Sequence, residues 1–189
     1  DFDADEMEQK IKDHFQMNDA PSTPFNRPVI TLPDNKEPLI AIATDKEATS
    51  NSIQFFYKHP NKPVKTIGDF RQQELIHGLF DQMINARLQE LSDKKDCPFM
   101  YAGVGYGNFL ARPTDAFMGF VSAKDGKVMQ AFESVLMENQ RAVQHGFLQT
   151  ELNRAKENLL LQYDKEAKEE SKTESSRLAA RYVDNFLEG

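Results

Sequence analysis

Four histidines, His14, His59, His77 and His145, have the greatest capacity for metal or acid–base chemistry in this sequence. A catalytic zinc ion takes three protein ligands and leaves a fourth position for water, and a helical site supplies two of the ligands as histidines one turn apart. No two of these histidines have that spacing. We therefore predict that this chain carries no metal site and no catalytic residues.

His77 and Asp81 form the most suggestive pair, because they lie four residues apart in a segment with a helical pattern. Two ligands do not make a zinc site, so we interpret the pair as a helix-surface histidine beside a local carboxylate. His145 directly precedes Gly146 and suits a helix C-terminus, where a cation is favoured. The single cysteine, Cys97, excludes an internal disulfide and is predicted to be an inert loop thiol.

The run Gly103-Val104-Gly105-Tyr106-Gly107 has the composition of a phosphate-binding loop but not its context. Such a loop leads into a helix N-terminus and carries a Lys followed by Ser or Thr, and neither feature is present here. Close packing of a strand against a long helix explains the glycines better.

The elements that position these residues follow from the apolar periodicity. A long helix over 67–91 is predicted, with Thr66 as its N-cap and Asp69 three residues on. The expected buried stripe of this helix is Ile76, Leu79, Phe80, Met83 and Leu88. Predicted strands cover residues 29–32, 39–44, 52–57, 99–106 and 116–123, and the last two are joined by a turn at 112–115.

Further helices flank these strands. A first helix is predicted after the N-cap Asp3, and the proline-containing segment 21–28 reads as a linker. A helix from Val128 is expected to end at Gly146, and two more helices follow. The order of elements predicts an α+β fold, with a mixed sheet of about five strands and helices packed mainly on one face.

The charge composition of the chain indicates which kinds of binding partner are not expected. The chain has 189 residues, a net charge of −7 and 28% charged residues, without a cluster of Lys and Arg. Nucleic acid and anionic membranes are therefore not expected partners. No apolar run approaches the roughly 20 residues needed to cross a bilayer, so membrane insertion is not expected. The sequence begins with Asp and not Met, and we expect it to be part of a longer protein.

Two motifs resemble the pitrilysin/insulinase family of zinc metallopeptidases, which use an inverted His-x-x-Glu-His motif. The run 85–91, Asn-Ala-Arg-Leu-Gln-Glu-Leu, is followed by a charged loop and a strand rich in small residues, as in the second-domain helix of that family. The run 146–156 is similar to a second family pattern, a turn leading into Glu-Leu-x-x-Ala-Lys, although Leu148 replaces the capping hydroxyl. The resemblance covers about residues 1–189.

The resemblance implies the non-catalytic second (C-terminal) domain of the metal-bearing half of a bacterial member, with the metallopeptidase LuxS/mitochondrial-processing-peptidase-like fold. Residues 1–20 would be the closing helix of a preceding, mostly absent domain, 21–28 a linker, and 29–189 the non-catalytic domain, truncated at its C-terminus. Asp1-Phe2-Asp3 matches the end of a family strand that leads into such a closing helix.

The family also holds substrate with an Arg and a Tyr from the half without metal. Tyr101 falls close to the Tyr position, but Ser92 falls where the Arg would be, so the role is not carried over and the substrate-binding residues stay unassigned. Arg87 and Glu90 are expected to serve structure, with Arg87 reaching a backbone or carboxylate group at the start of the next strand.

The function implied by the resemblance is that of a chamber-forming domain in a zinc metalloendopeptidase that degrades peptides. Zinc is expected in the parent protein, in a domain upstream, and no cofactor in this segment. The expected partners are the catalytic domain, the second homologous half and peptide substrates, and the periplasm or cell envelope is favoured over the cytoplasm. Two alternatives stay open, a catalytically dead scaffold subunit and a domain that binds extended peptides through a sheet edge.

Overall fold

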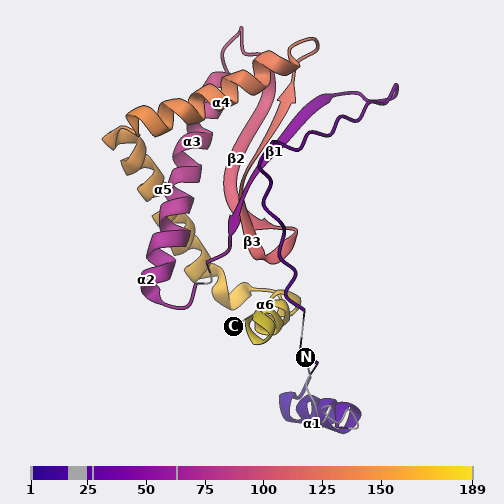
Figure 1. The fold of residues 1–189 in the computed structure, drawn as a ribbon. Helices are drawn as coiled ribbons and strands as arrows, with labels where there is room; N and C mark the ends of the chain where they lie inside the picture. Colours follow the sequence, from indigo (N-terminus) through magenta and orange to yellow (C-terminus); the bar gives the residue numbers. More distant parts are fainter. Residues whose placement is uncertain (1, 17–24, 27, 63, 189) are drawn as a thin grey trace. The chain divides into compact units, whose positions relative to one another are not determined.

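The computed structural model describes residues 2–16, 25–26, 28–62 and 64–188 (Figure 1). The chain divides into two compact units, Asp1–Ile30 and Thr31–Gly189, and each is considered by itself. Most of the predicted linker 21–28 lies outside the described residues.

The first unit contains helix α1, Ala4–Phe15. The predicted N-cap is confirmed, because the Asp3 carboxylate accepts a hydrogen bond of 2.9 Å from the Glu6 N–H. Met7, Ile11 and Phe15 share one face of the helix, and each remains substantially exposed.

The second unit is built on an antiparallel sheet of three strands in the order β1-β3-β2. Its strands are β1, Asn51–Pro60, β2, Phe99–Phe109, and β3, Ala111–Ala123. The central strand pairs on both sides, so that Gly119 lies opposite Phe55 on β1 and Val104 on β2. The α+β class is as predicted.

The predicted mixed sheet of about five strands is wrong, because residues 29–32 and 39–44 join no strand ladder in the structure. Leu32 is partly buried, but the other large apolar side chains are exposed, and Leu39, Ile40 and Ile42 are each more than four-fifths exposed. Alternating apolar residues form a strand where the backbone groups pair and one face is covered, and here neither condition holds.

The hairpin of β2 and β3 is confirmed, but its turn is not at 112–115. The chain reverses at Leu110, which has a left-handed φ of 56°, and the pairing is irregular at Asn108 and Phe109. Residues 112–115 therefore lie inside β3. Leucine is an uncommon residue at a positive φ, so this turn has no clear sequence signal.

The long helix predicted over 67–91 is confirmed, with one irregularity. It consists of α2, Ile67–Phe70, a π-helical turn over Arg71–Leu75, and α3, Ile76–Ser92. Its N-terminal capping box is also confirmed, since the Asp69 N–H donates to Thr66 Oγ1 (3.1 Å) and the Thr66 N–H donates to Asp69 Oδ2 (3.0 Å).

Three more helices follow the sheet: α4, Val128–His145, α5, Gln149–Glu169, and α6, Ser175–Glu188, with a 3₁₀ turn over Glu170–Lys172 between the last two. Helix α4 packs on the sheet, and α3 contacts β2, α4 and α5 (Figure 1). Gly146 ends α4 as predicted, with φ of 68° and its N–H donating to the Ala142 carbonyl at 2.9 Å.

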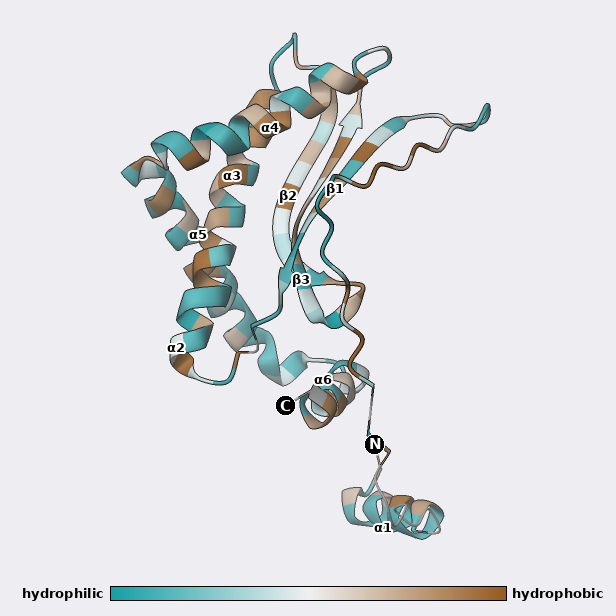
Figure 2. Cartoon of the chain, in the orientation of Figure 1, coloured by the Kyte–Doolittle hydropathy of each residue, from teal (hydrophilic) through white to brown (hydrophobic). Residues whose placement is uncertain are grey.

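The core lies between α4, α3 and one face of the sheet. Its most deeply buried large side chains are Phe99, Ile84, Leu88, Val121 and Val135. In the predicted stripe of α3, Met83 and Leu88 are buried and Phe80 packs against the core, but Ile76 is 57% exposed. Hydrophobic and hydrophilic residues alternate along both α3 and α4, as expected for helices with one covered side (Figure 2).

Candidate functional site

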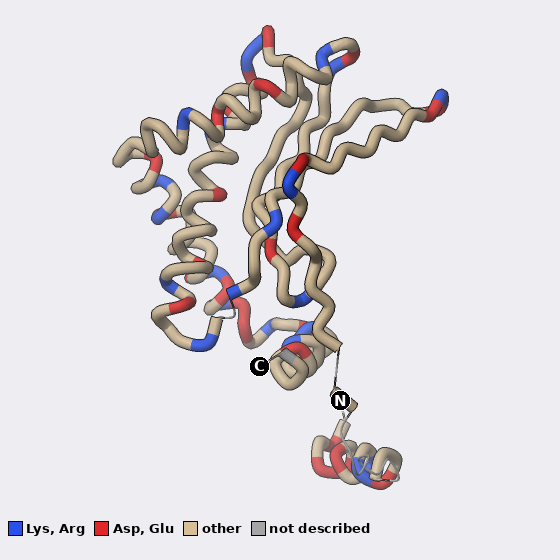
Figure 3. Tube along the Cα trace, in the orientation of Figure 1, with Lys and Arg blue, Asp and Glu red and all other residues tan. Residues whose placement is uncertain are grey.

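The face of the sheet opposite α4 carries an uncharged groove. Phe55 contacts Phe132 of α4 (5.7 Å between ring centroids), so its side chain lies on the face that α4 covers. Successive side chains of a strand point to opposite faces, and we call the face opposite Phe55 the open face. The groove measures about 430 Å³, and its lining includes Phe56 on β1, Tyr101 on β2, and Met118 and Phe120 on β3. None of the lining residues has a charged side chain, and β2 has no charged residue along its length (Figure 3).

Glycines of β2 form the floor of this groove. A Cβ atom at Gly105 would lie 3.1 Å from Asp81 Oδ2, and one at Gly103 would lie 3.0 Å from the Tyr101 hydroxyl oxygen. The predicted close packing against the long helix is confirmed at Gly105, while Gly107 faces the end of Met118 instead. The space over the two glycines is therefore occupied by the Asp81 carboxylate and the Tyr101 hydroxyl, and the rings of Tyr101 and Phe120 lie 6.1 Å apart at one end of the groove.

Helix α3 closes part of the outer edge of β2. Asn85 Nδ2 donates to the Val104 carbonyl at 2.7 Å, and the Val104 N–H donates to Asn85 Oδ1 at 2.9 Å. The Tyr106 N–H donates to Asp81 Oδ2 at 3.3 Å. These side chains satisfy backbone groups that an added strand would need, so β2 cannot extend the sheet at these residues. The alternative of peptide binding through a sheet edge is not supported at β2.

His77 and Asp81 both meet Tyr106, from neighbouring turns of α3. The His77 ring stacks on the Tyr106 ring, with 4.2 Å between centroids and 13° between planes. Burial raises the pKa of the Asp81 carboxyl to about 6, although the hydrogen bond from the Tyr106 N–H acts in the opposite direction. Burial, followed by the Asp81 charge, also raises the pKa of Tyr106. The pair is thus partly buried in the sheet contact, in place of the predicted helix-surface position.

We expect Asp81→Asn to remove a pH dependence of stability. Because its folded pKa is raised from 3.8 to about 6, Asp81 favours the folded state most below pH 3.8, and this contribution is lost as pH rises through about 6. The loss is about 1 kcal/mol after allowance for partial exposure. Asparagine keeps an oxygen for the Tyr106 N–H. Urea unfolding across this range measures the effect, and an equal decline in both proteins would contradict it.

Arg87 joins three helices through a network of ion pairs. Its Nε and Nη2 donate to the two carboxylate oxygens of Glu151 at 2.5 and 2.8 Å, and Nη1 donates to Glu138 Oε1 at 3.3 Å. Nη2 also donates to the Gly146 carbonyl at 2.9 Å, and the guanidinium lies 4.5 Å from the centroid of the Phe147 ring. The partners differ from the predicted group at the start of β2, because they are Glu138 of α4, Glu151 of α5 and the Gly146 carbonyl between these helices.

The network also shifts the pKa values of its members. Hydrogen bonding from Arg87 lowers the pKa of Glu151 to about 2, and Glu151 in turn raises the pKa of Arg87. Glu151 Oε2 accepts from the Leu148 N–H at 2.6 Å, so the acidic half of a capping box forms even though Leu148 has no hydroxyl. Sequence reasoning missed Glu138 and Glu151 as partners because they lie 51 and 64 residues from Arg87.

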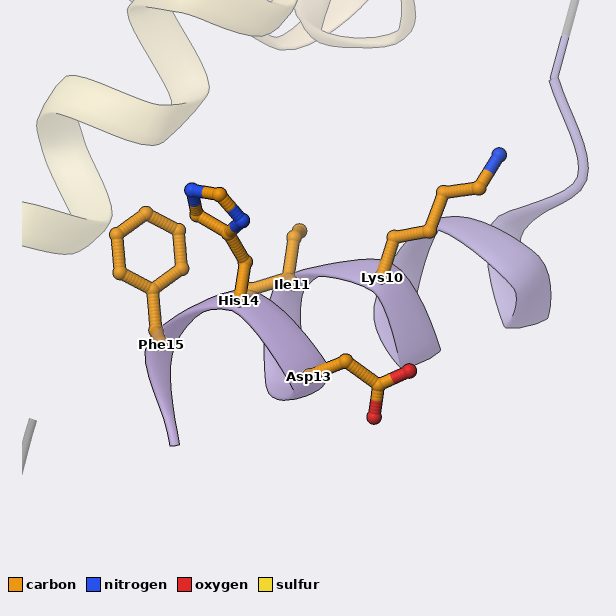
Figure 4. A pocket seen from close by; sticks show the side chains of 5 residues that line it. All are labelled: Lys10, Ile11, Asp13, His14 and Phe15. Atoms are coloured by element: carbon orange, nitrogen blue, oxygen red, sulfur yellow. The ribbon is translucent and has the colours of Figure 1, made fainter. Parts of the chain in front are cut away.

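The remaining candidate residues lie apart. Ser92 Oγ donates to the Gln89 carbonyl at 2.7 Å, Cys97 is buried in the loop before β2, and His145 is the last residue of α4. His14 lies against Phe15 in α1, beside a shallow hollow lined by this one exposed helix (Figure 4). Across the part of the chain that the structure describes, no three or more His, Cys, Asp or Glu side chains are placed to hold a metal ion.

The sequence of the chain is similar to that of two zinc proteases. No family model matches it. The chain is 31% identical over 102 residues, 54% of its length, to a protein of Arabidopsis thaliana named zinc protease PQQL-like, and covers 11% of that protein. It is 26% identical over 189 residues, 98% of its length, to the probable zinc protease PqqL of Escherichia coli, and covers 20% of it. The chain thus spans one-fifth or less of the length of these relatives.

Solved structures share the fold. The first half of the periplasmic protease PqqL from Escherichia coli matches with a TM-score of 0.78 at 23% identity, over 99% of this chain and 40% of that one. A predicted insulinase family protease from Yersinia pestis matches with a TM-score of 0.71 at 12% identity, over 96% of this chain and 39% of that one. Among the described helices, none has the length and hydropathy of a membrane span.

Proposed function

We propose that this chain, a relative of the insulinase-type zinc proteases, forms a non-catalytic wall of a peptide-degrading chamber. The observation that carries the proposal is the open face, because α4 packs on the other side of the sheet and the groove on the open face is lined by aromatic and other uncharged side chains. A surface of this kind suits contact with a peptide in extended conformation.

The finer assignment follows the same reasoning. We place the chain as the second domain of the metal-bearing half, with residues 1–20 closing a preceding domain, 21–28 as a linker and 29–189 as the wall domain. Its partners would be the catalytic domain and a homologous half, and its compartment the periplasm or cell envelope of a bacterium. The match to the first half of a periplasmic protease supports this placement.

The described residues of this chain do not fit a catalytic zinc ion. His14 belongs to α1, His59 to β1, His77 to α3 and His145 to α4, and no three suitable ligands converge. In the proposed parent, residues outside this chain would hold the zinc ion, whose chemistry is to activate a water molecule for peptide hydrolysis.

The purified chain is expected to bind no stoichiometric zinc and to cleave no peptide, because it lacks a converging ligand set among its described residues. Elemental analysis after zinc loading, together with a fluorogenic-peptide assay, measures both properties. A His59→Ala, His77→Ala double variant is the matched control and should behave as the unaltered chain does. About one zinc ion per chain with cleavage that a chelator abolishes would contradict the proposal.

A further inference from the structure

We propose that residues 67–82, which we call the latch, close on the end of β2 when the Asp81 carboxyl is neutral and open locally when it is ionised. The latch comprises α2, the π-helical turn and the first two turns of α3. Three features support this pH-dependent device: the weak anchoring of the latch, its contacts with Tyr106, and the surroundings of its carboxyl group.

The latch is the weakly anchored half of the long helix. Among the described residues of this helix, none from 67 to 82 is buried, whereas Ile84 and Leu88 are fully buried. The Arg87 network holds the second half as well. Within the latch, the π-helical turn over Arg71–Leu75 interrupts the regular helix, and such turns often mark functional sites. Segments with few buried contacts open locally at a lower free energy than the whole domain does.

Tyr106 of β2 is the common contact of the latch. His77 stacks on the Tyr106 ring at 4.2 Å, and Phe80 meets the same ring edge-on at 5.9 Å. Phe80 also packs against Phe117 at 6.1 Å. The Tyr106 N–H donates to Asp81 Oδ2 at 3.3 Å, which is long for a hydrogen bond of this kind. The contact therefore joins apolar packing, which does not depend on pH, with one carboxyl group that does.

The Asp81 carboxyl is poorly placed to carry a charge in this contact. Its Oδ1 atom is buried and has no hydrogen-bond partner in the part of the chain that the structure describes. Burial raises the pKa of the carboxyl to about 6, and the hydrogen bond from the Tyr106 N–H acts against this rise. A partly desolvated carboxylate with one long hydrogen bond gains free energy when it returns to water. Ionisation of Asp81 as pH rises through about 6 therefore favours the open latch.

The neighbouring titratable groups do not supply a lasting positive charge. His77 precedes Asp81 by one turn, and His59 of β1 meets the Tyr106 ring at 5.9 Å. Histidine in general loses its charge between about pH 5 and 8, so an imidazole gives no compensation above that range. The other groups are acidic: Asp115 lies opposite His59 in the sheet, and burial, followed by the Asp81 charge, raises the pKa of Tyr106.

Native-state hydrogen exchange on the 189-residue chain tests the proposal. The hydrogen-bonded amides of the latch and of Tyr106 are compared with that of Val135, a fully buried residue of α4, at about pH 5 and about pH 7.5, after correction for the intrinsic exchange rate. The latch amides are expected to be less protected than Val135. Their protection should fall about fivefold between the two pH values, because partial exposure of the carboxyl reduces the effect of its pKa shift. Latch amides as protected as Val135, or protection that does not change with pH, would overturn the proposal.

Three variants assign the pH dependence to one residue. Asp81→Asn keeps an oxygen for the Tyr106 N–H but cannot ionise, so latch protection should be equal at both pH values. His77→Phe keeps a ring against Tyr106 without the imidazole and should retain the fivefold fall. Asp93→Asn, at the exposed C-cap residue of α3, is the matched control and should also retain it. Circular dichroism checks that each variant is folded. A fall that persists in Asp81→Asn, or that disappears in His77→Phe, would overturn the proposal.

Discussion

Replacing Arg87 with alanine is expected to lower the free energy of unfolding by about 3 to 5 kcal/mol. The substitution leaves Glu138, whose side chain is 4% exposed, with Arg141 as its remaining ion-pair partner. It also removes the guanidinium that donates to both carboxylate oxygens of Glu151. It also removes the stacking on Phe147 and the hydrogen bond to the Gly146 carbonyl. Breaking a buried ion pair from one side is costly because the other charge stays buried.

Chemical denaturation measures this effect, and Arg141→Ala is its control. Arg141 binds the same Glu138 at 2.8 Å, but its side chain is 64% exposed, so its loss should cost no more than about 1 kcal/mol. The pKa of Glu151 is lowered to about 2, so its contribution is complete above its ordinary value of 4.5 and is lost as pH falls through about 2. Equal losses for the two arginine variants would contradict the account.

Gly119→Val is expected to destabilise the chain by about 3 kcal/mol or to prevent folding. A Cβ atom at Gly119 would lie 2.1 Å from Cζ of Phe55, far inside van der Waals contact. The Phe55 ring cannot easily move away, since it packs against Phe117 and Phe132 with centroids 6.3 and 5.7 Å distant. The glycine is therefore required because an aromatic ring from the paired strand covers it.

Two comparisons separate this clash from a general effect of replacing a strand glycine. Gly107→Ala meets only the flexible end of Met118, at 3.2 Å, and should cost less than about 1 kcal/mol. Combining Gly119→Ala with Phe55→Leu should cost less than the sum of the two single changes, because the smaller side chain opens space. Additive losses in thermal denaturation would show that the ring and the glycine do not interact.

Local structure was predictable where a few neighbouring residues decide it. The caps at Asp3 and Thr66 and the helix end at Gly146 depend on contacts within three or four residues, and all three are confirmed. Leu110 shows the opposite case, because the hairpin turn depends on the register of two long strands and not on turn-forming residues. The apolar segment 39–44 read as a strand, but alternation alone does not show whether a partner strand pairs with it.

Long-range contacts account for the rest of what the sequence did not reveal. Ile84 is fully buried on α3, one turn from both Phe80 and Leu88, yet it was left out of the predicted stripe, while Ile76 was included and is exposed. The partners of Arg87 come from helices far along the chain. The groove was hidden for a similar reason, because the glycines of β2 become a floor only when Phe120 and its neighbours on β3 are placed beside them.

The most direct test of the central claim, that the open face contacts peptide without cleaving it, is photo-crosslinking. A phenylalanine-containing peptide with a benzophenone group is irradiated with the chain, and mass spectrometry maps the crosslinked residues and the integrity of the peptide. The account predicts crosslinks within 101–106 and 118–120, with the peptide intact in the presence of zinc. Crosslinks confined to α5 or α6, or a peptide cut in a chelator-sensitive reaction, would contradict it.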